Sequence, residues 1–134
     1  MTDAEAVLSQ NLEFYRAIGA RDLAALERLW AEDAAVSCIH PGWPVIHGRV
    51  LVLQSWRAIL TGPQAPRIRC NAEEAAMHGA TALVTCEETL DGGSLAACNL
   101  FVLEHGVWRL AHHQATPIMA RQQSGRSRPR SSIH

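Results

Sequence analysis

Three short turns that contain glycine divide the second half of the chain into segments of similar length. They are His78-Gly79, Asp91-Gly92-Gly93 and His105-Gly106, and the segments lie near residues 66–77, 80–90, 94–104 and 107–117. Each segment has the length of a long β-strand, and each turn is short enough for a hairpin. We therefore expect an antiparallel meander of four strands.

The first helix is predicted by its cap and by its apolar spacing. Thr2 and Glu5 form a capping box, and apolar residues then recur at helical intervals as far as Tyr15. Gly19 follows, and we expect it to end this helix as a left-handed cap residue.

Two more helices and a short strand complete the first half. Asp22 caps the second helix, and residues 34–39 are partly β-branched as in a strand. A third helix begins after Gly48 and runs to about Leu60. Helices first and strands afterwards is the order of an α+β domain. A helical layer on a curved sheet forms a cone that is open at one end, so we expect a pocket between the two layers.

The composition is that of an ordinary globular protein, with 134 residues, 48% of them hydrophobic and 19% charged. No apolar run is long enough to cross a bilayer, and the first residues lack the layout of a signal peptide. We expect a cytoplasmic protein without membrane contact. The cysteines have neither paired nor zinc-ribbon spacing, so we interpret all four as reduced, buried apolar residues: Cys38, Cys70, Cys86 and Cys98.

Charge separates a domain from a tail. Residues 1–119 carry 8 arginines and 13 acids, which gives 8 − 13 = −5, whereas residues 120–134 carry four arginines and no acid. The last segment is rich in Ser, Arg, Gly and Pro and has almost no apolar side chains, so we predict a disordered basic tail. Four scattered arginines are too few to favour nucleic acid as a partner.

Three stretches resemble one superfamily. "FYRAIGARDLAALERLWAEDAAV" is similar to the start of SnoaL-like polyketide cyclases and ketosteroid isomerases, and "CIHPGWPVIHG…SW" is similar to a bacterial SnoaL-like subgroup. "HGVWRLAHHQATP" resembles the last hairpin of the association domain of calcium/calmodulin-dependent protein kinase. The resemblance implies a cone-shaped α+β fold of the nuclear-transport-factor-2-like (NTF2-like, cystatin-like) kind, with three N-terminal helices on a curved antiparallel sheet.

The same resemblance leaves the function open, because this fold carries enzymes, ligand binders and assembly domains. One hypothesis is a small-molecule enzyme that transfers protons on an apolar, carbonyl-bearing metabolite. The other is a non-catalytic ligand-binding or dimerisation domain. The ketosteroid isomerase pattern is altered here, because its tyrosine position falls on Phe14, its base position on Cys38, and its second aspartate near Asn99.

The candidate catalytic pair is Glu87 with His112. Alignment with the kinase association domain places Thr85 and Asn99 inside the pocket, and strand alternation then adds Glu87. The same alternation places His112 inside and His113 outside, unless a bulge reverses the last strand. A carboxylate and an imidazole in an apolar cone are suited to general base and acid roles.

The rim of the pocket is predicted in the His-Pro-Gly-Trp turn after the first strand. His40 and Trp43 would contact a ligand there, and Trp56 on the third helix is added as a ligand contact, although core packing is its other interpretation. His40, His47, Glu87 and His112 are possible metal ligands by type, but their spacing matches no zinc pattern. We therefore expect neither a metal nor a cofactor.

A homodimer is predicted from the outer face of the sheet, which would carry Val84, Cys86 and Ala111. Such an apolar face needs cover. The polarity of the pocket separates the two functions: two or more ionisable groups within hydrogen-bond reach favour an enzyme, and one polar group among aliphatic side chains favours a binder.

Overall fold

A computed structural model describes residues 1–119, and its first element is a long helix, α1 (Asp3–Ala20). The predicted capping box is confirmed, since Thr2 Oγ1 accepts from the Glu5 N–H and Glu5 returns the bond. The prediction that Gly19 ends the helix was wrong. Gly19 is helical, and Arg21 takes the left-handed conformation with φ 54° while its N–H donates to the Ala17 and Ile18 carbonyls.

Two shorter helices and two short strands follow, as expected except for the second strand. α2 (Leu23–Leu29) begins at Asp22, whose carboxylate accepts the Ala25 N–H at 3.0 Å. A chain reversal then contains β1 (Ser37–Ile39) and β2 (Ile46–His47), and it leads into α3 (Arg49–Thr61). The sequence did not indicate β2, because a two-residue strand carries no periodic pattern.

The predicted meander is confirmed. It consists of β3 (Arg69–His78), β4 (Thr81–Leu90), β5 (Gly93–Glu104) and β6 (Val107–Pro117). The three glycine turns join these strands as antiparallel neighbours. β1 adds to the far side of β6 in parallel, which gives one six-stranded sheet in the order β2-β1-β6-β5-β4-β3.

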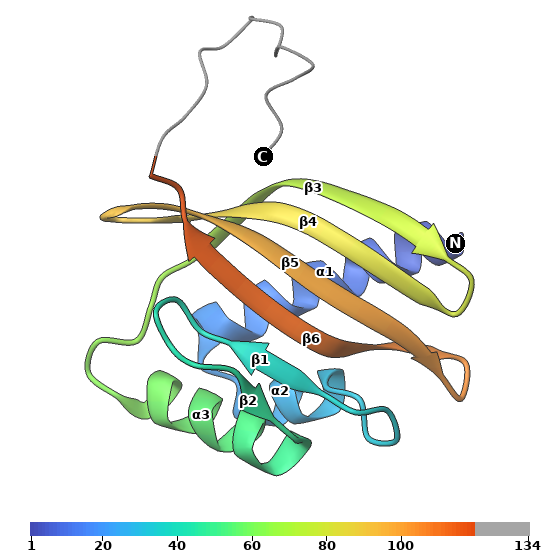
Figure 1. Cartoon of the computed structure of the whole chain (residues 1–134), viewed down its shortest axis with the longest axis horizontal. Helices are drawn as coiled ribbons and strands as arrows, with labels where there is room; N and C mark the ends of the chain where they lie inside the picture. The colour runs from blue at the N-terminus through green and yellow to red at the C-terminus, as the bar shows by residue number, and fades with distance from the viewer. Residues whose placement is uncertain (120–134) are drawn as a thin grey trace, which may run out of the picture.

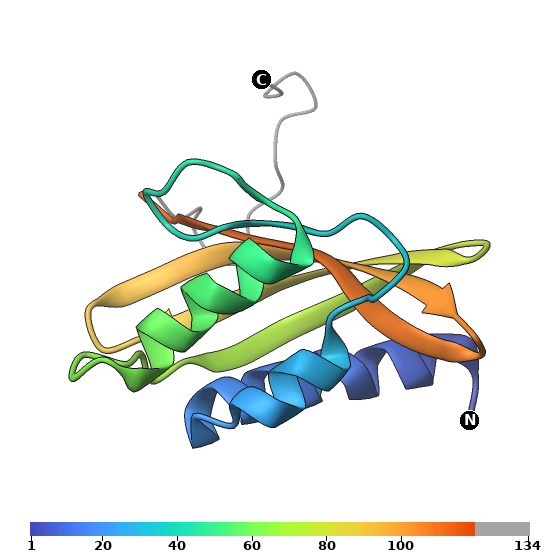
Figure 2. The same cartoon turned by 90° about the horizontal axis from the view of Figure 1, so that it is seen from below.

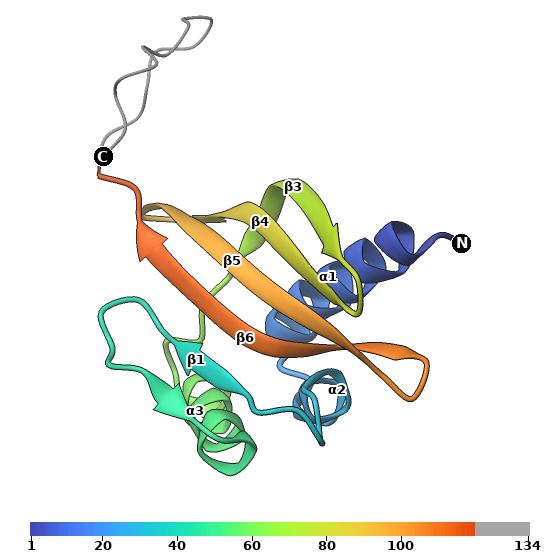
Figure 3. The same cartoon turned by 45° about the vertical axis from the view of Figure 1, so that its right-hand side comes forward.

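The helices lie together on one side of this sheet. Figure 2 shows the helices on one side of the strands, and Figure 1 shows α1 running behind the meander while α2 and α3 lie behind β1 and β2. The oblique view shows the sheet twisting around this layer (Figure 3). Apolar side chains from both layers fill the space between them, and the largest of these buried side chains are Trp30, Phe14, Phe101 and Ile18.

Two bulges bend the long strands. The β3–β4 register shifts between Asn71 and Glu74, where Ala72 has φ 57°. The β5–β6 register also shifts, because Leu100 pairs with His112 whereas Phe101 pairs with Leu110. A bulge increases twist and reverses which face the following side chains occupy. The second bulge therefore decides which residues of β6 face the helices.

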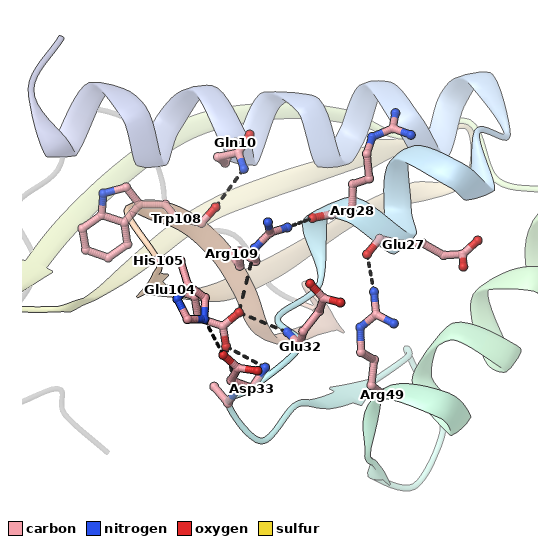
Figure 4. Close-up of polar contacts among 11 residues, drawn as sticks. Gln10, Glu27, Arg28, Glu32, Asp33, Arg49, Glu104, His105, Trp108 and Arg109 are labelled. Atoms are coloured by element: carbon pink, nitrogen blue, oxygen red, sulfur yellow. Dashed lines mark hydrogen bonds and ion pairs between the residues drawn. The ribbon is translucent and has the colours of Figure 1, made fainter.

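A buried carboxylate at the end of β5 holds the connection between α2 and β1. Glu104 accepts the backbone N–H groups of residues 32, 33 and 34 at 3.1, 3.0 and 2.7 Å (Figure 4). The Arg109 Nε lies 3.9 Å from the same carboxylate, and the Arg109 guanidinium donates to the Arg28 carbonyl. We call this arrangement the Glu104 clamp; it ties the last hairpin to the helical layer.

The remaining predictions on organisation concern the membrane and the tail. In the part of the chain that the structure describes, no helix is both long and apolar enough to cross a bilayer. The basic tail predicted for residues 120–134 lies outside the described residues. All four cysteines are free thiols, and Cys38 and Cys86 are buried.

Candidate active site in the cone interior

The polar centre of the cone interior is a hydrogen bond between α1 and β4. The Tyr15 hydroxyl donates to Glu88 Oε2 at 2.6 Å, and the two residues are 5% and 2% exposed. Tyr15 belongs to the buried stripe of α1. Glu88 is on the inner face of β4 because it alternates with the buried residues Val84 and Cys86.

Two asparagines and a histidine extend this contact into a network. Asn99 Nδ2 donates to Asn11 Oδ1 at 2.8 Å and to the Tyr15 hydroxyl oxygen at 3.1 Å. Asn99 Oδ1 is therefore its acceptor end, so the His113 Nδ1–H donates to it at 2.5 Å. The other ring nitrogen of His113, Nε2, lies 3.8 Å from Glu88 Oε2.

Burial sets the charge states of the network. Desolvation raises the pKa of Glu88 above its ordinary value, and the Tyr15 hydrogen bond opposes this only in part. Desolvation, followed by the nearby His40 and His112, lowers the pKa of His113 to about 3. His113 is thus neutral at pH 7, with its Nε2 lone pair on the side of the Glu88 carboxylate. Desolvation and the Glu88 charge also raise the pKa of Tyr15, which keeps its proton.

A second polar group lies beside the first. The Ser55 hydroxyl donates to the Val52 carbonyl at 2.7 Å, so the His40 Nε2–H donates to Ser55 Oγ at 2.8 Å. The His40 ring packs edge-on against Trp43 and Trp56, with ring centroids 4.8 Å away in both cases. Burial lowers the pKa of His40 to about 4, so this histidine is also neutral at pH 7.

Trp56 connects the two polar groups. Its ring lies 5.8 Å from that of His113, and its indole Nε1 is buried with no hydrogen-bond partner among residues 1–119. Trp43, by contrast, is 46% exposed and covers His40 from the solvent side. His40 and Trp56 are therefore interior residues. Of the two predicted rim residues, only Trp43 is at the surface. Their roles as ligand contacts stay predictions.

Thiols line the edge of the network without forming a metal site. Cys86 Sγ lies 3.5 Å from the Tyr15 hydroxyl, and Cys70 Sγ accepts from Asn11 Nδ2 at 3.7 Å. Burial raises the pKa of Cys38 to about 12, which keeps that thiol protonated. Within residues 1–119 no group of three His, Cys, Asp or Glu side chains comes together as a metal ion requires.

The predicted orientation of β4 was wrong by one residue. Thr85 is exposed and Glu87 is half-buried, and both border a hollow of about 460 Å³ on the sheet face opposite the helices. Glu88 takes the interior position instead. Alternation alone could not decide which glutamate faces the interior. Each face of β4 has a glutamate two residues after a small side chain: Glu87 after Thr85, and Glu88 after Cys86.

The predicted orientation of β6 was wrong because of its bulge. Ala111 is the extra residue between Leu110 and His112, and it moves His113 to the inner face. His112 lies on the outer face, where its Nδ1 is 2.7 Å from Ser37 Oγ and its Nε2 is 2.8 Å from Gln114 Oε1.

The three residues given for the outer face were also wrong. Val84 and Cys86 face the core, and Ala111 is the buried bulge residue. Half-buried Leu83, Leu100 and Val102 occupy the outer face instead, since each pairs out of phase with the buried side chains.

Sequence reasoning placed Asn99 correctly on the inner face and missed its partners. Asn11, Tyr15 and Ser55 received no role, and the tyrosine position was given to Phe14, which packs edge-on against Trp30 and other rings. One signal was available. Asn11 and Tyr15 are four residues apart in the apolar stripe of α1, so a polar side chain there must be buried with a partner.

Comparison with known proteins agrees with this architecture. The sequence profile of the SnoaL-like domain matches residues 7–120. The chain belongs to the SnoaL-like family. Its fold is NTF2-like, as the resemblance implied, and the neighbours named below include proteins of that fold.

Three relatives of this SnoaL-like protein carry names. An NTF2-like protein from Streptomyces avermitilis, provisionally named a dehydratase, is 32% identical with a TM-score of 0.81, over 88% of this chain and 97% of its own. A protein from Thiobacillus denitrificans, provisionally named a calcium/calmodulin-dependent protein kinase type II association domain, is 27% identical with a TM-score of 0.75, over 82% and 93%.

The third relative is the F-box protein SKIP8 of Arabidopsis thaliana, which is 30% identical over 116 residues. The match covers 85% of this chain and 50% of the plant protein, so the chain spans half the length of this curated relative. An NTF2-like protein from Cytophaga hutchinsonii, 17% identical with a TM-score of 0.74 over 88% of this chain and 100% of its own, shares the fold.

Proposed function

We propose that this protein is a small-molecule enzyme that moves protons on an apolar metabolite bearing a carbonyl or hydroxyl group. The contact between Tyr15 and Glu88, with His113 Nε2 3.8 Å from the same carboxylate oxygen, carries the proposal. Burying ionisable groups is unfavourable, and apolar residues would fill the space more stably. Convergence of several such groups is the property of an acid–base site.

The three side chains divide the proton transfer among them. Glu88 is the base, because its raised pKa brings it closer to neutrality, where a carboxylate both accepts and returns a proton. The neutral Nε2 of His113 lies beside it and can share that proton. Tyr15 keeps its own proton and donates a hydrogen bond to the substrate oxygen, where negative charge develops.

Asn99 holds the tyrosine in place. Asn99 donates to the Tyr15 oxygen and is itself fixed by Asn11 and His113. A proton taken from the carbon beside a carbonyl can return at another carbon, which is isomerisation, or leave with a hydroxyl group as water, which is dehydration. The relative provisionally named a dehydratase favours the second reaction.

Substrate access requires side chains to move, since every member of the network is less than a tenth exposed. Closure of this kind excludes water and strengthens electrostatic interactions in the site. An open conformation for binding and a closed one for chemistry are therefore part of the proposal.

Exchange of solvent deuterium into small ketones tests the proposal. A panel of linear and cyclic ketones in D₂O, followed by proton NMR, reports removal of the proton beside the carbonyl. We expect Glu88→Gln to lower the catalysed rate by roughly 10²- to 10⁴-fold. Glu87→Gln is the matched control, because the neighbouring carboxylate lies on the outer face. Equal rates for both variants, with both folded by circular dichroism, would contradict a catalytic role of Glu88.

A second candidate is an association domain, which one observation favours. The outer sheet face carries half-buried Leu83, Leu100 and Val102, and the same face has a hollow of about 460 Å³ bordered by Thr85 and Glu87. The 27% identical relative provisionally named an association domain fits this reading. A homodimer through this face follows, and Leu100→Arg would convert it to a monomer. Light scattering at micromolar concentration measures the masses of the wild type and of Leu100→Arg. A monomeric wild type would contradict the homodimer.

A further inference from the structure

An open hollow of about 700 Å³ lies between the end of α1 and the sheet, and the function proposed above does not account for it. Gly19, Arg67, Arg69 and Asp91 are on its border, together with apolar Ile68 and Leu90. A smaller hollow of about 350 Å³ continues from it along residues 63–66 and shares Arg67, Leu90 and Asp91. The two together form one open region at this end of the molecule.

The hollow is adjacent to the buried network. Leu90 lies on its border two residues after Glu88 and on the same face of β4, so the hollow begins about 7 Å along the strand from the catalytic carboxylate. Gly19 is one helical turn beyond Tyr15. The helix rises about 1.5 Å and the strand about 3.3 Å per residue, so the hollow begins about 6 Å along α1 from Tyr15.

Gly19 leaves free space at the helix side of the hollow. Its backbone is helical without a positive φ, and a Cβ built on it would meet no atom within 4 Å. Neither conformation nor close packing therefore requires glycine, although glycine weakens a helix relative to alanine. Its one structural consequence is the space that a side chain would otherwise occupy.

The charged side chains of the hollow favour an anion. The exposed guanidinium groups of Arg67 and Arg69 make no ion pair or hydrogen bond with any residue in the described range 1–119. Asp91 opposes them, which leaves a local balance of 2 − 1 = +1. Guanidinium groups bind carboxylate and phosphate through paired hydrogen bonds.

We propose that this hollow is the entrance to the buried site and that it binds the acidic group of the substrate. The inference rests on the proposed function, and it names the substrate class as a short oxo acid. Its carboxylate is held by Arg67 and Arg69, and its carbonyl reaches Tyr15 and Glu88. Because the hollow begins about 6 Å along α1 from Tyr15, the carboxylate and the carbonyl must be at least roughly four or five bonds apart.

A matched pair of probes tests the charge. 5-Oxohexanoate and 2-hexanone both have six carbons and a methyl ketone, but only the first has a carboxylate. We expect 5-oxohexanoate to shift the amide NMR signals of Gly19, Ile68 and Leu90. The double variant Arg67→Gln with Arg69→Gln should weaken its binding by about tenfold or more and leave 2-hexanone unaffected.

Four further variants complete the test of the entrance. Arg57→Gln, an exposed arginine on α3, is the control for total charge and should not change binding. Asp91→Asn should tighten 5-oxohexanoate binding. Gly19→Met should fill the hollow and abolish binding of both probes without lowering the thermal midpoint, whereas Ala24→Met on the exposed face of α2 should leave binding intact.

The outcomes separate this inference from the proposed function. Two results would contradict the proposal that the hollow is the entrance. One is 5-oxohexanoate binding that does not change in the double arginine variant, and the other is the absence of amide shifts at the hollow with either probe. Deuterium exchange that depends on Glu88 but not on the arginines supports the proposed function and contradicts the entrance. Binding that depends on the arginines, without catalysed deuterium exchange, supports an oxo-acid binding site and contradicts the proposed enzymatic function.

Discussion

Glu88 and Glu104 are two buried carboxylates with opposite environments. Glu88 is 2% exposed in the cone interior, and Glu104 is 9% exposed at the end of β5. Burial alone would raise the pKa of Glu104, but its three backbone N–H donors together outweigh burial and hold that pKa below its ordinary value. Glu88 has one hydroxyl donor against its burial, and its pKa is raised.

Under the proposed function, the difference separates a carboxylate that stabilises the fold from one that takes part in catalysis. Backbone N–H groups are fixed by the chain and cannot leave, so Glu104 is permanently satisfied and serves the clamp of Figure 4. The donor of Glu88 is a side-chain hydroxyl that a substrate could turn toward itself. A carboxylate kept under-solvated and near exchangeable protons is available for chemistry.

The largest expected effect concerns pH, because the interior holds neutral histidines. The folded pKa of His113, about 3, is below its unfolded value of 6.5. Its stability contribution is therefore complete above pH 6.5 and is lost as the pH falls toward 3, by about 1.4 kcal/mol per pH unit. His113→Asn retains a donor for Asn99. Between pH 6.5 and 4.5 we expect the free energy of unfolding of this variant to fall by about 3 kcal/mol less than that of the wild type.

Urea unfolding at several pH values measures this slope. His105→Asn is the control from the clamp region, because the His105–Asp33 pair is largely exposed and surface pairs contribute little. The Glu88 carboxyl titrates in the opposite direction, so the comparison uses the difference between variant and wild type. Identical slopes for wild type and His113→Asn would show that His113 is hydrated or charged in the fold.

A smaller effect should have opposite signs at the two carboxylates. Glu104→Gln removes one acceptor oxygen from the clamp and sets an amide N–H against backbone N–H groups, so we expect a loss of about 2 kcal/mol in the free energy of unfolding. Glu88→Gln keeps an acceptor for Tyr15 and removes a desolvated charge. At pH 8 we expect it to stabilise the fold by about 1 kcal/mol.

Chemical denaturation at pH 8 gives both values in one experiment. Glu32→Gln is the matched control, because Glu32 uses only its backbone N–H in the clamp and its side chain is exposed. If Glu88→Gln and Glu104→Gln destabilise the fold to the same extent, the two carboxylates do not differ in role. Glu88 would then be structural, like Glu104.

The sequence predicted the parts of this comparison that depend on local patterns. The glycine turns fixed the meander, and Thr2 and Asp22 fixed helix starts, because caps and turns are satisfied within a few residues. Asn99 was placed by the resemblance to the kinase association domain, and no bulge before it in β5 reverses the faces. The clamp was not predicted, since Glu104 meets residues 32–34, about seventy positions earlier in the chain.

The sequence by itself determined the α+β class, the order of the helices and the long strands, and the family. Only the tertiary structure decided which side chains form the site. A single bulge at Ala111 exchanged His112 for His113, and the pairing of β4 exchanged Glu87 for Glu88. Because the side-chain period of a strand is two, one residue of register reverses the faces, and register is set by contacts between distant segments.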